Sequence, residues 1–168
     1  MGILTILGQV GPLILATATA FMAYFTYLVV KENRKQDHIR FLEKSIEEFY
    51  EPLINTLRKG PYYGIMDKDL NEVIRIFISK RYLCSAQLAN ILPYTVADVF
   101  SGTPVSSIDK GTVYTFTKEE DFDKWRNAAD KIWEEYLKKI DEYSKLVGTV
   151  VDISKFNKPS WASLKPKK

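Results

Sequence analysis

The sequence predicts an all-α protein in which a single N-terminal transmembrane helix continues into a cytoplasmic bundle of about three helices. Three observations support this fold class. Residues 3–30 carry no charged side chain, later apolar residues recur at helical spacing, and Gly or Pro residues stand near the ends of those helical patterns. The predicted divisions are a membrane anchor over 1–30, a stalk over 31–59, a bundle over 60–148 and a tail over 149–168.

The first segment is long enough to cross a lipid bilayer. A helix needs about 20 apolar residues to span the hydrocarbon core, and residues 3–30 exceed that length. Basic residues follow at once, at Lys31, Arg34 and Lys35, whereas no Lys or Arg precedes the segment. Because basic residues are retained in the cytoplasm, we expect a single-pass signal anchor in the cell membrane, with the N-terminus outside and the C-terminal domain cytoplasmic.

Three other interpretations of this segment are weaker. Ala16-Thr17-Ala18 resembles the cleavage site of a signal peptide, but no basic residue precedes it and the apolar sequence continues through Phe25. A buried helix of a soluble domain would require a larger protein than 168 residues. A helix lying in the membrane plane would require a charged face, which this segment lacks.

Small residues form a candidate contact face on the predicted span. Ala16 and Ala20 are four residues apart, and Ala23 follows three residues later. Small residues at such spacing let helices approach closely in lipid, so these alanines are candidate contacts with a second helix. The alternative is that small residues are simply common in membrane spans.

The stalk carries a second candidate interaction face. Its apolar residues are spaced three, four and three positions apart, which is the a/d spacing of a coiled coil. The pattern covers only about two heptads, so an amphipathic helix that docks on its own domain is the alternative to a self-associating stalk. This face consists of Ile39, Leu42, Ile46 and Phe49.

A proline and a Gly-Pro pair should interrupt the stalk. Pro52 should distort the helix near Glu48, because a proline ring clashes with the carbonyl four residues earlier. The Gly-Pro pair at 60–61 should then end the helix. Directly afterwards, Tyr62 and Tyr63 are candidate contacts for a groove or the lipid interface, and tyrosines that cap the end of the bundle are the alternative.

The rest of the chain predicts two helices separated by a loop. The first helix should begin near Asp69, with Glu72 completing a capping box, and should end before Pro93. Residues 102–117 are rich in Gly, Ser and Thr and should form an ordered loop, within which 112–117 suits a short extended piece.

The second helix should cover 118–147 and end at Gly148. After it, Val150, Val151, Ile153 and Phe156 are expected to lie across the bundle. The final residues combine Trp161 with several lysines, which suits contact with anionic headgroups, and a frayed terminus is the alternative.

The sequence predicts no enzyme, no catalytic residues, no metal site and no cofactor. The chain has one histidine, His38, and one cysteine, Cys84, whereas a zinc site needs several such residues. Cys84 lies on an apolar stripe and is expected to be a structural thiol. Acidic pairs such as Glu134 and Glu135 are expected to be solvated. The net charge of +3 is too mild to indicate nucleic-acid binding.

These features predict a membrane-anchored, non-enzymatic interaction or accessory subunit of a membrane assembly. Its expected partners are the lipid bilayer and either further copies of the chain or a larger membrane complex. The alternative is a membrane-tethered ligand-sensing or effector bundle with a pocket between its helices. Aromatic residues proposed to line that pocket are Tyr82, Trp125, Trp133 and Tyr136.

Overall fold

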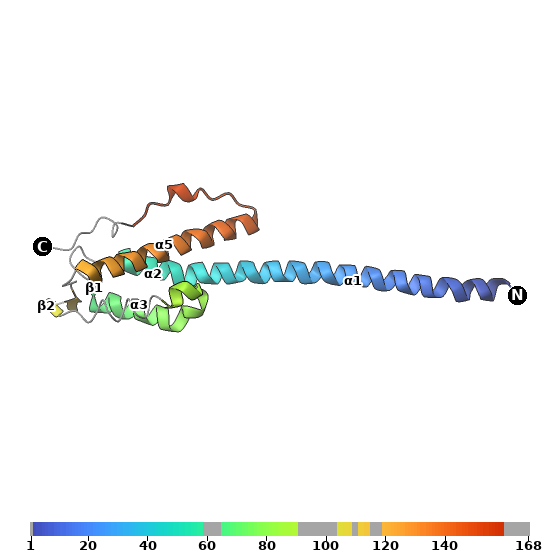
Figure 1. Cartoon of the computed structure of the whole chain (residues 1–168), viewed down its shortest axis with the longest axis horizontal. Helices are drawn as coiled ribbons and strands as arrows, with labels where there is room; N and C mark the ends of the chain where they lie inside the picture. Colours follow the sequence, from blue (N-terminus) through green and yellow to red (C-terminus); the bar gives the residue numbers. More distant parts are fainter. Residues whose placement is uncertain (1, 59–64, 91–103, 109–110, 115–118, 160–168) are drawn as a thin grey trace. The chain divides into compact units, whose positions relative to one another are not determined.

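The computed structural model is predominantly helical, as the sequence predicts (Figure 1). The chain divides into two compact units, residues 1–40 and 41–168. The residues that the structure describes are 2–58, 65–90, 104–108, 111–114 and 119–159.

The N-terminal helix continues beyond the predicted anchor. Helix α1 covers Gly2–Ser45 without interruption and contains Pro12. The prediction that the anchor and the first part of the stalk form one helix is therefore confirmed. Pro12 leaves this helix unbroken, which agrees with the tolerance of proline in apolar helices.

The predicted distortion before Pro52 is confirmed, and it takes the form of a π-helix. Segment η1 (Ile46–Tyr50) separates α1 from α2 (Glu51–Arg58), and the amide of Glu51 donates to the carbonyl of Ile46, five residues back. Pro52 has no N–H, and its ring would clash with the carbonyl of Glu48 in a regular α-turn. A wider turn relieves this clash while the helical path continues.

The predicted helix from Asp69 to Pro93 is shorter and broken. Helix α3 (Asp67–Lys80) begins two residues earlier than expected and passes into the short 3-10 helix η2 (Arg81–Leu83). Helical structure resumes only over 86–90. Ser85 starts this new helix, because its Oγ accepts a hydrogen bond from the amide of Leu88 at 3.1 Å, which is an N-cap contact.

Part of the predicted loop is a small antiparallel sheet. Strand β1 (Ile65–Met66) pairs with β3 (Gly111–Tyr114), which also pairs with β2 (Pro104–Ile108). The expected loop is therefore wrong over 104–108, whereas the short extended piece expected over 112–117 is confirmed at 112–114. The sequence showed only one short extended piece, and one strand without a partner cannot form a sheet. Its partner β1 lies far away in the sequence, so the pairing could not be predicted.

The last long helix is confirmed almost residue for residue. Helix α5 covers Glu119–Val147, and Gly148 follows it with a φ of +75°. The amide of Thr149 donates to the carbonyl of Ser144 at 2.9 Å, which is the six-to-one bond of a Schellman motif. Glycine is favoured at Gly148 because a side chain is strained at this φ.

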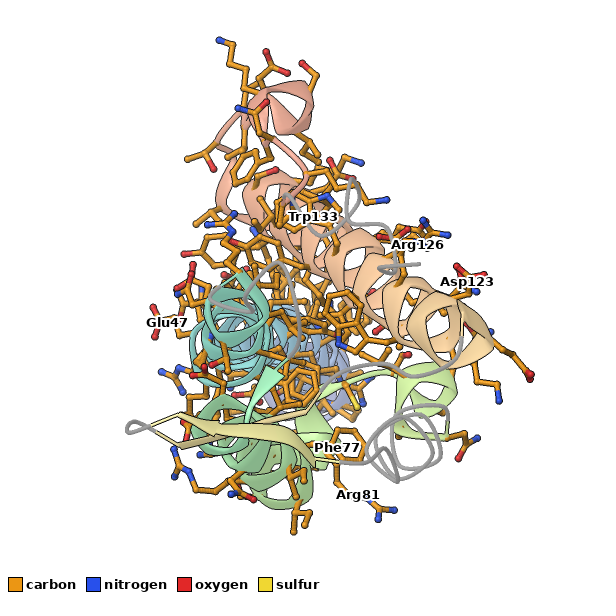
Figure 2. The ribbon with its side chains drawn as sticks, turned by 90° about the vertical axis from the view of Figure 1, so that its left-hand side faces the viewer. Glu47, Phe77, Arg81, Asp123, Arg126 and Trp133 are labelled. Atoms are coloured by element: carbon orange, nitrogen blue, oxygen red, sulfur yellow. The ribbon has the colours of Figure 1, made fainter. Side chains whose placement is uncertain are left out.

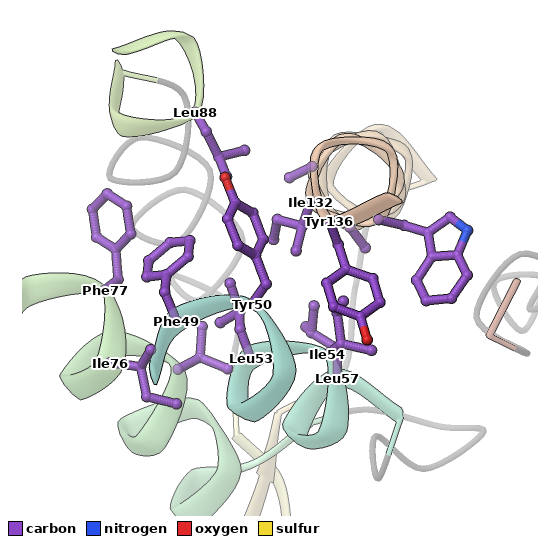
Figure 3. Close-up of a cluster of buried hydrophobic side chains, with 14 of the residues drawn as sticks. Phe49, Tyr50, Leu53, Ile54, Leu57, Ile76, Phe77, Leu88, Ile132 and Tyr136 are labelled. Carbon is purple, nitrogen blue, oxygen red and sulfur yellow. The ribbon is translucent and has the colours of Figure 1, made fainter. Parts of the chain in front are cut away.

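The core of the second unit lies around η1 and α2, which contact both α3 and α5 (Figure 3). Phe49 packs edge-to-face on Tyr50, with ring centroids 4.9 Å apart. The ring of Phe49 lies 6.5 Å from that of Phe77 in α3, and the ring of Tyr50 lies 6.5 Å from that of Tyr136 in α5. Aromatic packing thus joins the central segment to the helices on either side.

Candidate membrane anchor and inter-helix contacts

The apolar side chains of the candidate anchor are exposed along α1. Residues 11–38 are all exposed, and they include large side chains such as Leu13, Phe21 and Phe25. Monomeric soluble proteins rarely leave so large a continuous apolar surface in water. Within the described part of the chain, one helix is long and apolar enough to cross a membrane, judged by its length and composition.

The polar side chains of this segment form hydrogen bonds within the helix. The hydroxyls of Thr17, Thr19 and Thr26 each donate to the carbonyl four residues earlier, at 2.7, 2.8 and 2.8 Å. A hydroxyl without a partner is costly in hydrocarbon. These bonds remove that cost, so the three threonines are compatible with a lipid environment.

The three candidate alanines share one face of α1. Ala16, Ala20 and Ala23 lie at positions that recur after four and three residues, which places them above one another on a helix. All three are exposed. The surface that a second helix would need for close approach is therefore present on the chain.

The candidate coiled-coil face is buried within the chain. Leu42 and Phe49 have no exposed surface, and Ile39 and Ile46 are also buried. Ile46 and Phe49 belong to the hydrophobic core shared with α3 and α5. The prediction that these four residues form an exposed seam between chains is therefore corrected. Because they are buried, they fit the alternative, in which an amphipathic helix docks on its own domain.

Tyr62 and Tyr63, the other candidate contacts, lie outside the described residues, as does Trp161.

A half-buried carboxylate joins three segments of the second unit. Glu135 in α5 accepts a hydrogen bond from the hydroxyl of Tyr50 in η1 at 2.7 Å, and its other oxygen accepts one from the hydroxyl of Ser85. Tyr50 is completely buried. Burial, and then the contact with Glu135, raise the pKa of Tyr50 far above its usual range. Tyr50 therefore acts as a protonated hydrogen-bond donor.

Glu135 is a site residue that the sequence interpretation missed. Glu134 is exposed, as expected, but Glu135 is only partly exposed. The available signal was its position three residues after the buried Ile132, at the edge of the apolar stripe. Other carboxylates do face solvent: Glu47 projects away from the helices in Figure 2, and its side chain is exposed.

Further polar contacts hold the ends of these helices. Lys80 at the end of α3 pairs with Glu48 in η1, and this contact lowers the pKa of the Glu48 carboxyl. The hydroxyl of Tyr143 near the end of α5 donates to Glu43 in α1 at 2.8 Å. Because these side chains come from different elements, they specify how the helices are aligned along their lengths.

The four aromatic residues proposed for a ligand pocket do not come together around one space. Trp125, Trp133 and Tyr136 are buried in the hydrophobic core, and Trp133 is labelled on α5 in Figure 2. Tyr82 is 57% exposed, and the ammonium group of Lys44 lies 5.8 Å from its ring centroid. The three buried rings contribute to packing between helices.

The remaining candidates for chemistry are the single cysteine and the single histidine of the chain. Cys84 is half-buried against the core, and burial raises the pKa of its thiol, with a further increase from the Glu135 carboxylate. This environment disfavours the reactive thiolate. His38 is exposed and belongs to the other unit. Among the described residues, no three His, Cys, Asp or Glu side chains gather as a metal site requires.

Comparisons with known proteins place the chain in a family. A family model described as "Uncharacterized protein" matches residues 39–164. A protein of Archaeoglobus fulgidus, also described as "Uncharacterized protein", is 31% identical over 158 residues, covering 88% of this chain and 74% of the relative. No solved structure matches the chain. The match over 39–164 covers most of the sequence, and the chain therefore belongs to this family.

Proposed function

We propose that the protein is a single-pass membrane protein that holds a helical domain at the cytoplasmic surface and acts as a non-enzymatic accessory subunit of a membrane assembly. The observation that carries this proposal is the exposed apolar surface of α1, which is followed directly by Lys31, Arg34 and Lys35. A bilayer is the environment in which such a surface is stable.

The free energy of insertion favours this arrangement. Leu, Ile, Phe and Val near the centre of a span each contribute about −0.3 to −0.6 kcal/mol. The segment contains many of these residues and no charged one, and the three threonine hydroxyls are already hydrogen-bonded. The positive charges after Val30 favour retention of the domain in the cytoplasm.

An accessory role is supported by how the domain uses its polar groups. Its conspicuous contacts, from Tyr50 and Ser85 to Glu135 and from Lys80 to Glu48, join one helix to another. Meanwhile the face of Ala16 and Ala20 remains exposed for a neighbouring membrane helix. The chain thus offers a contact surface in the anchor and a stably packed domain behind it.

Cysteine accessibility in intact cells tests the topology. Two variants in a Cys84→Ser background carry one new cysteine each, Thr5→Cys near the N-terminal end of the span and Glu134→Cys on the exposed face of α5. A membrane-impermeant maleimide should label Thr5→Cys in intact cells and Glu134→Cys only after permeabilisation. Labelling of Glu134→Cys in intact cells would exclude a cytoplasmic domain, and recovery of the protein in the soluble fraction would exclude the anchor.

Crosslinking in native membranes tests the accessory role. A lipid-soluble crosslinker should capture the chain in species larger than the monomer, with a second copy or with another membrane protein. Exclusive recovery of monomer, under conditions that crosslink a known membrane oligomer in the same sample, would contradict the proposal.

A further inference from the structure

Three basic side chains follow the candidate span on one side of α1. Lys31, Arg34 and Lys35 are all exposed, and at 3.6 residues per turn they fall within an arc of about 100° around the helix axis. We call these three residues the basic face. Tyr27 and Tyr24, one and two turns before Lys31, fall within the same arc. Aromatic and basic side chains thus form one stripe along the helix.

The carboxylates of this segment lie outside the stripe and have other partners. Glu32 accepts a hydrogen bond from the side-chain amide of Gln36 at 3.1 Å, and Asp37 lies 3.9 Å from a guanidinium nitrogen of Arg40. Arg40 is on the opposite side of the helix from Lys31, nine residues further along. Among the described residues, no carboxylate forms an ion pair with a member of the basic face. The described part of the chain therefore leaves this positive charge unneutralised.

The turn after α5 is different, because its lysines already have partners. Lys145 pairs with Asp141 at 2.6 Å, and Lys155, in the short 3-10 helix η3 (Ile153–Lys155), pairs with Asp152 at 3.6 Å. The expectation that the apolar side chains after Gly148 lie across the bundle is wrong for three of them, which are exposed: Val150, Val151 and Phe156. Exposed apolar side chains there stand beside neutralised lysines, whereas the basic face keeps its charge.

The depth of the basic face matches the headgroup layer of a bilayer. Val30 is the last residue before the charges, and we take it as the edge of the hydrocarbon core. A rise of 1.5 Å per residue then places the three members of the basic face at about 2, 6 and 8 Å beyond that edge. The headgroup layer is roughly 5–8 Å thick on each side of the bilayer. Tyr27 lies about one turn inside the edge, in the zone where tyrosine is enriched in membrane spans.

We propose that the basic face binds the phosphate of an anionic phospholipid, whose acyl chains lie along Tyr27 and Tyr24. This inference rests on the proposed membrane anchor and names the class of lipid around it. Guanidinium and ammonium groups are the side chains that bind phosphate, and the headgroup layer supplies phosphate at this depth. Because choline cancels the phosphate charge of phosphatidylcholine, a basic face without carboxylate partners favours an anionic headgroup. The span therefore collects anionic lipid on one side.

Quenching by labelled lipids tests this selectivity in the full-length protein. In a Cys84→Ser background, a fluorescent dye is attached to Leu28→Cys, an exposed position one turn before the basic face. The vesicles contain equal amounts of phosphatidylcholine and phosphatidylglycerol, and in each experiment one of the two lipids carries a nitroxide on its acyl chain. Both leaflets have the same composition, so the result does not depend on the direction in which the span inserts.

Labelled phosphatidylglycerol should quench the dye several-fold more strongly than labelled phosphatidylcholine. Arg34→Gln should lower this ratio, and its combination with Lys31→Gln and Lys35→Gln should bring the ratio close to one. Arg40→Gln is the matched control, because it removes the same charge from the opposite side of the helix. The control should leave the ratio unchanged.

A ratio of one with the basic face intact would overturn the inference, and so would equal losses in Arg34→Gln and Arg40→Gln. Loss of the preference when inorganic phosphate is added at constant ionic strength would also overturn it, and would assign the basic face to a soluble phosphate compound. In these three cases both labelled lipids still quench the dye, so the anchor stands. If neither lipid quenches the dye, the anchor fails as well.

Discussion

Glu135 shows how one carboxylate specifies the positions of three segments. It accepts hydrogen bonds from Tyr50 in η1 and from Ser85, the residue that starts the helix over 86–90. The same Ser85 oxygen accepts from the amide of Leu88. A buried donor that loses its acceptor costs more free energy than a hydrogen bond contributes on average. The consequence of a substitution therefore depends on which partner is removed.

We expect Glu135→Ala to lower the free energy of unfolding of the second unit by about 1–3 kcal/mol, because the buried Tyr50 hydroxyl loses its acceptor. Glu134→Ala, next to it but exposed, should change the free energy by less than about 0.5 kcal/mol. Urea titration followed by tryptophan fluorescence measures both, because all three tryptophans lie after residue 40. Equal losses in the two variants would show that the contact with Tyr50 contributes nothing.

Tyr50 also predicts how stability depends on alkaline pH. Its pKa is raised in the folded protein, chiefly by burial, whereas a tyrosine in an unfolded chain ionises near pH 10. The folded state therefore binds more protons than the unfolded state above about pH 10, and stability falls as the pH rises, with a slope of up to about 1.4 kcal/mol per pH unit for one such group. Below pH 10 this contribution is fully present.

The variant Tyr50→Phe should lose part of this alkaline slope. Unfolding midpoints measured between pH 8 and pH 11 should fall less steeply for the variant than for the wild type. At pH 8 the variant should still be less stable than the wild type, because it lacks the hydrogen bond to Glu135. Parallel pH profiles would contradict the assigned protonation state of Tyr50.

At the scale of one element, the segment formed by η1 and α2 stays buried on both sides of a break in its α-helical hydrogen bonding. The π-turn of η1 precedes Pro52, and buried residues stand on both sides of it, with Phe49 and Tyr50 before and Leu53 and Ile54 after. A π-turn shifts the helical phase by about one residue. Because of that shift, the buried residues before and after the π-turn face the same core. Pro52 thus causes the π-turn, and the packing of these residues stabilises it.

Phe49→Ala distinguishes a core residue from a seam between chains. Because Phe49 has no exposed surface, its truncation should destabilise the second unit by about 3–5 kcal/mol, and the loss should not depend on protein concentration. Phe41→Ala, at a partly exposed phenylalanine, should cost much less. Chemical unfolding at two protein concentrations measures this difference. A midpoint for the wild type that rises with concentration would instead favour self-association through this face.

At the scale of the whole molecule, the proposed membrane association and the stability of the second unit should be separate properties. The candidate anchor presents side chains that remain exposed, whereas the second unit depends on side chains that are buried together. A substitution in the span should therefore change the assembly of the protein without unfolding its domain. The alanine face provides a direct test of this separation.

We expect Ala20→Leu to weaken association between spans, because a larger side chain keeps the helices apart. Ala18→Leu is the matched control, since position 18 lies on the opposite side of the helix from Ala16 and Ala20. Crosslinking yield in native membranes should fall for Ala20→Leu and stay unchanged for Ala18→Leu. An unchanged yield in both variants would show that this face makes no contact.

Local sequence signals predicted several elements closely. The apolar N-terminal helix, the distortion at Pro52 and the helix ending at Gly148 depend on features that are local in the sequence: an uncharged run, a missing N–H and a glycine. Short-range steric and hydrogen-bonding rules act on these residues wherever the chain folds. The sequence by itself therefore determined where these elements begin, bend or end.

Only the tertiary structure decided which surfaces face inward. It buried Leu42 and Phe49, paired β1 with β3, moved Glu135 next to Tyr50 and left Val150 exposed. Each outcome depends on residues that are distant in the sequence. Periodicity shows that a helix has an apolar face or a strand a possible edge, but it does not show which element covers it. Which element covers a given apolar face depends on the free energy of packing between elements, and this free energy is determined only in the folded chain.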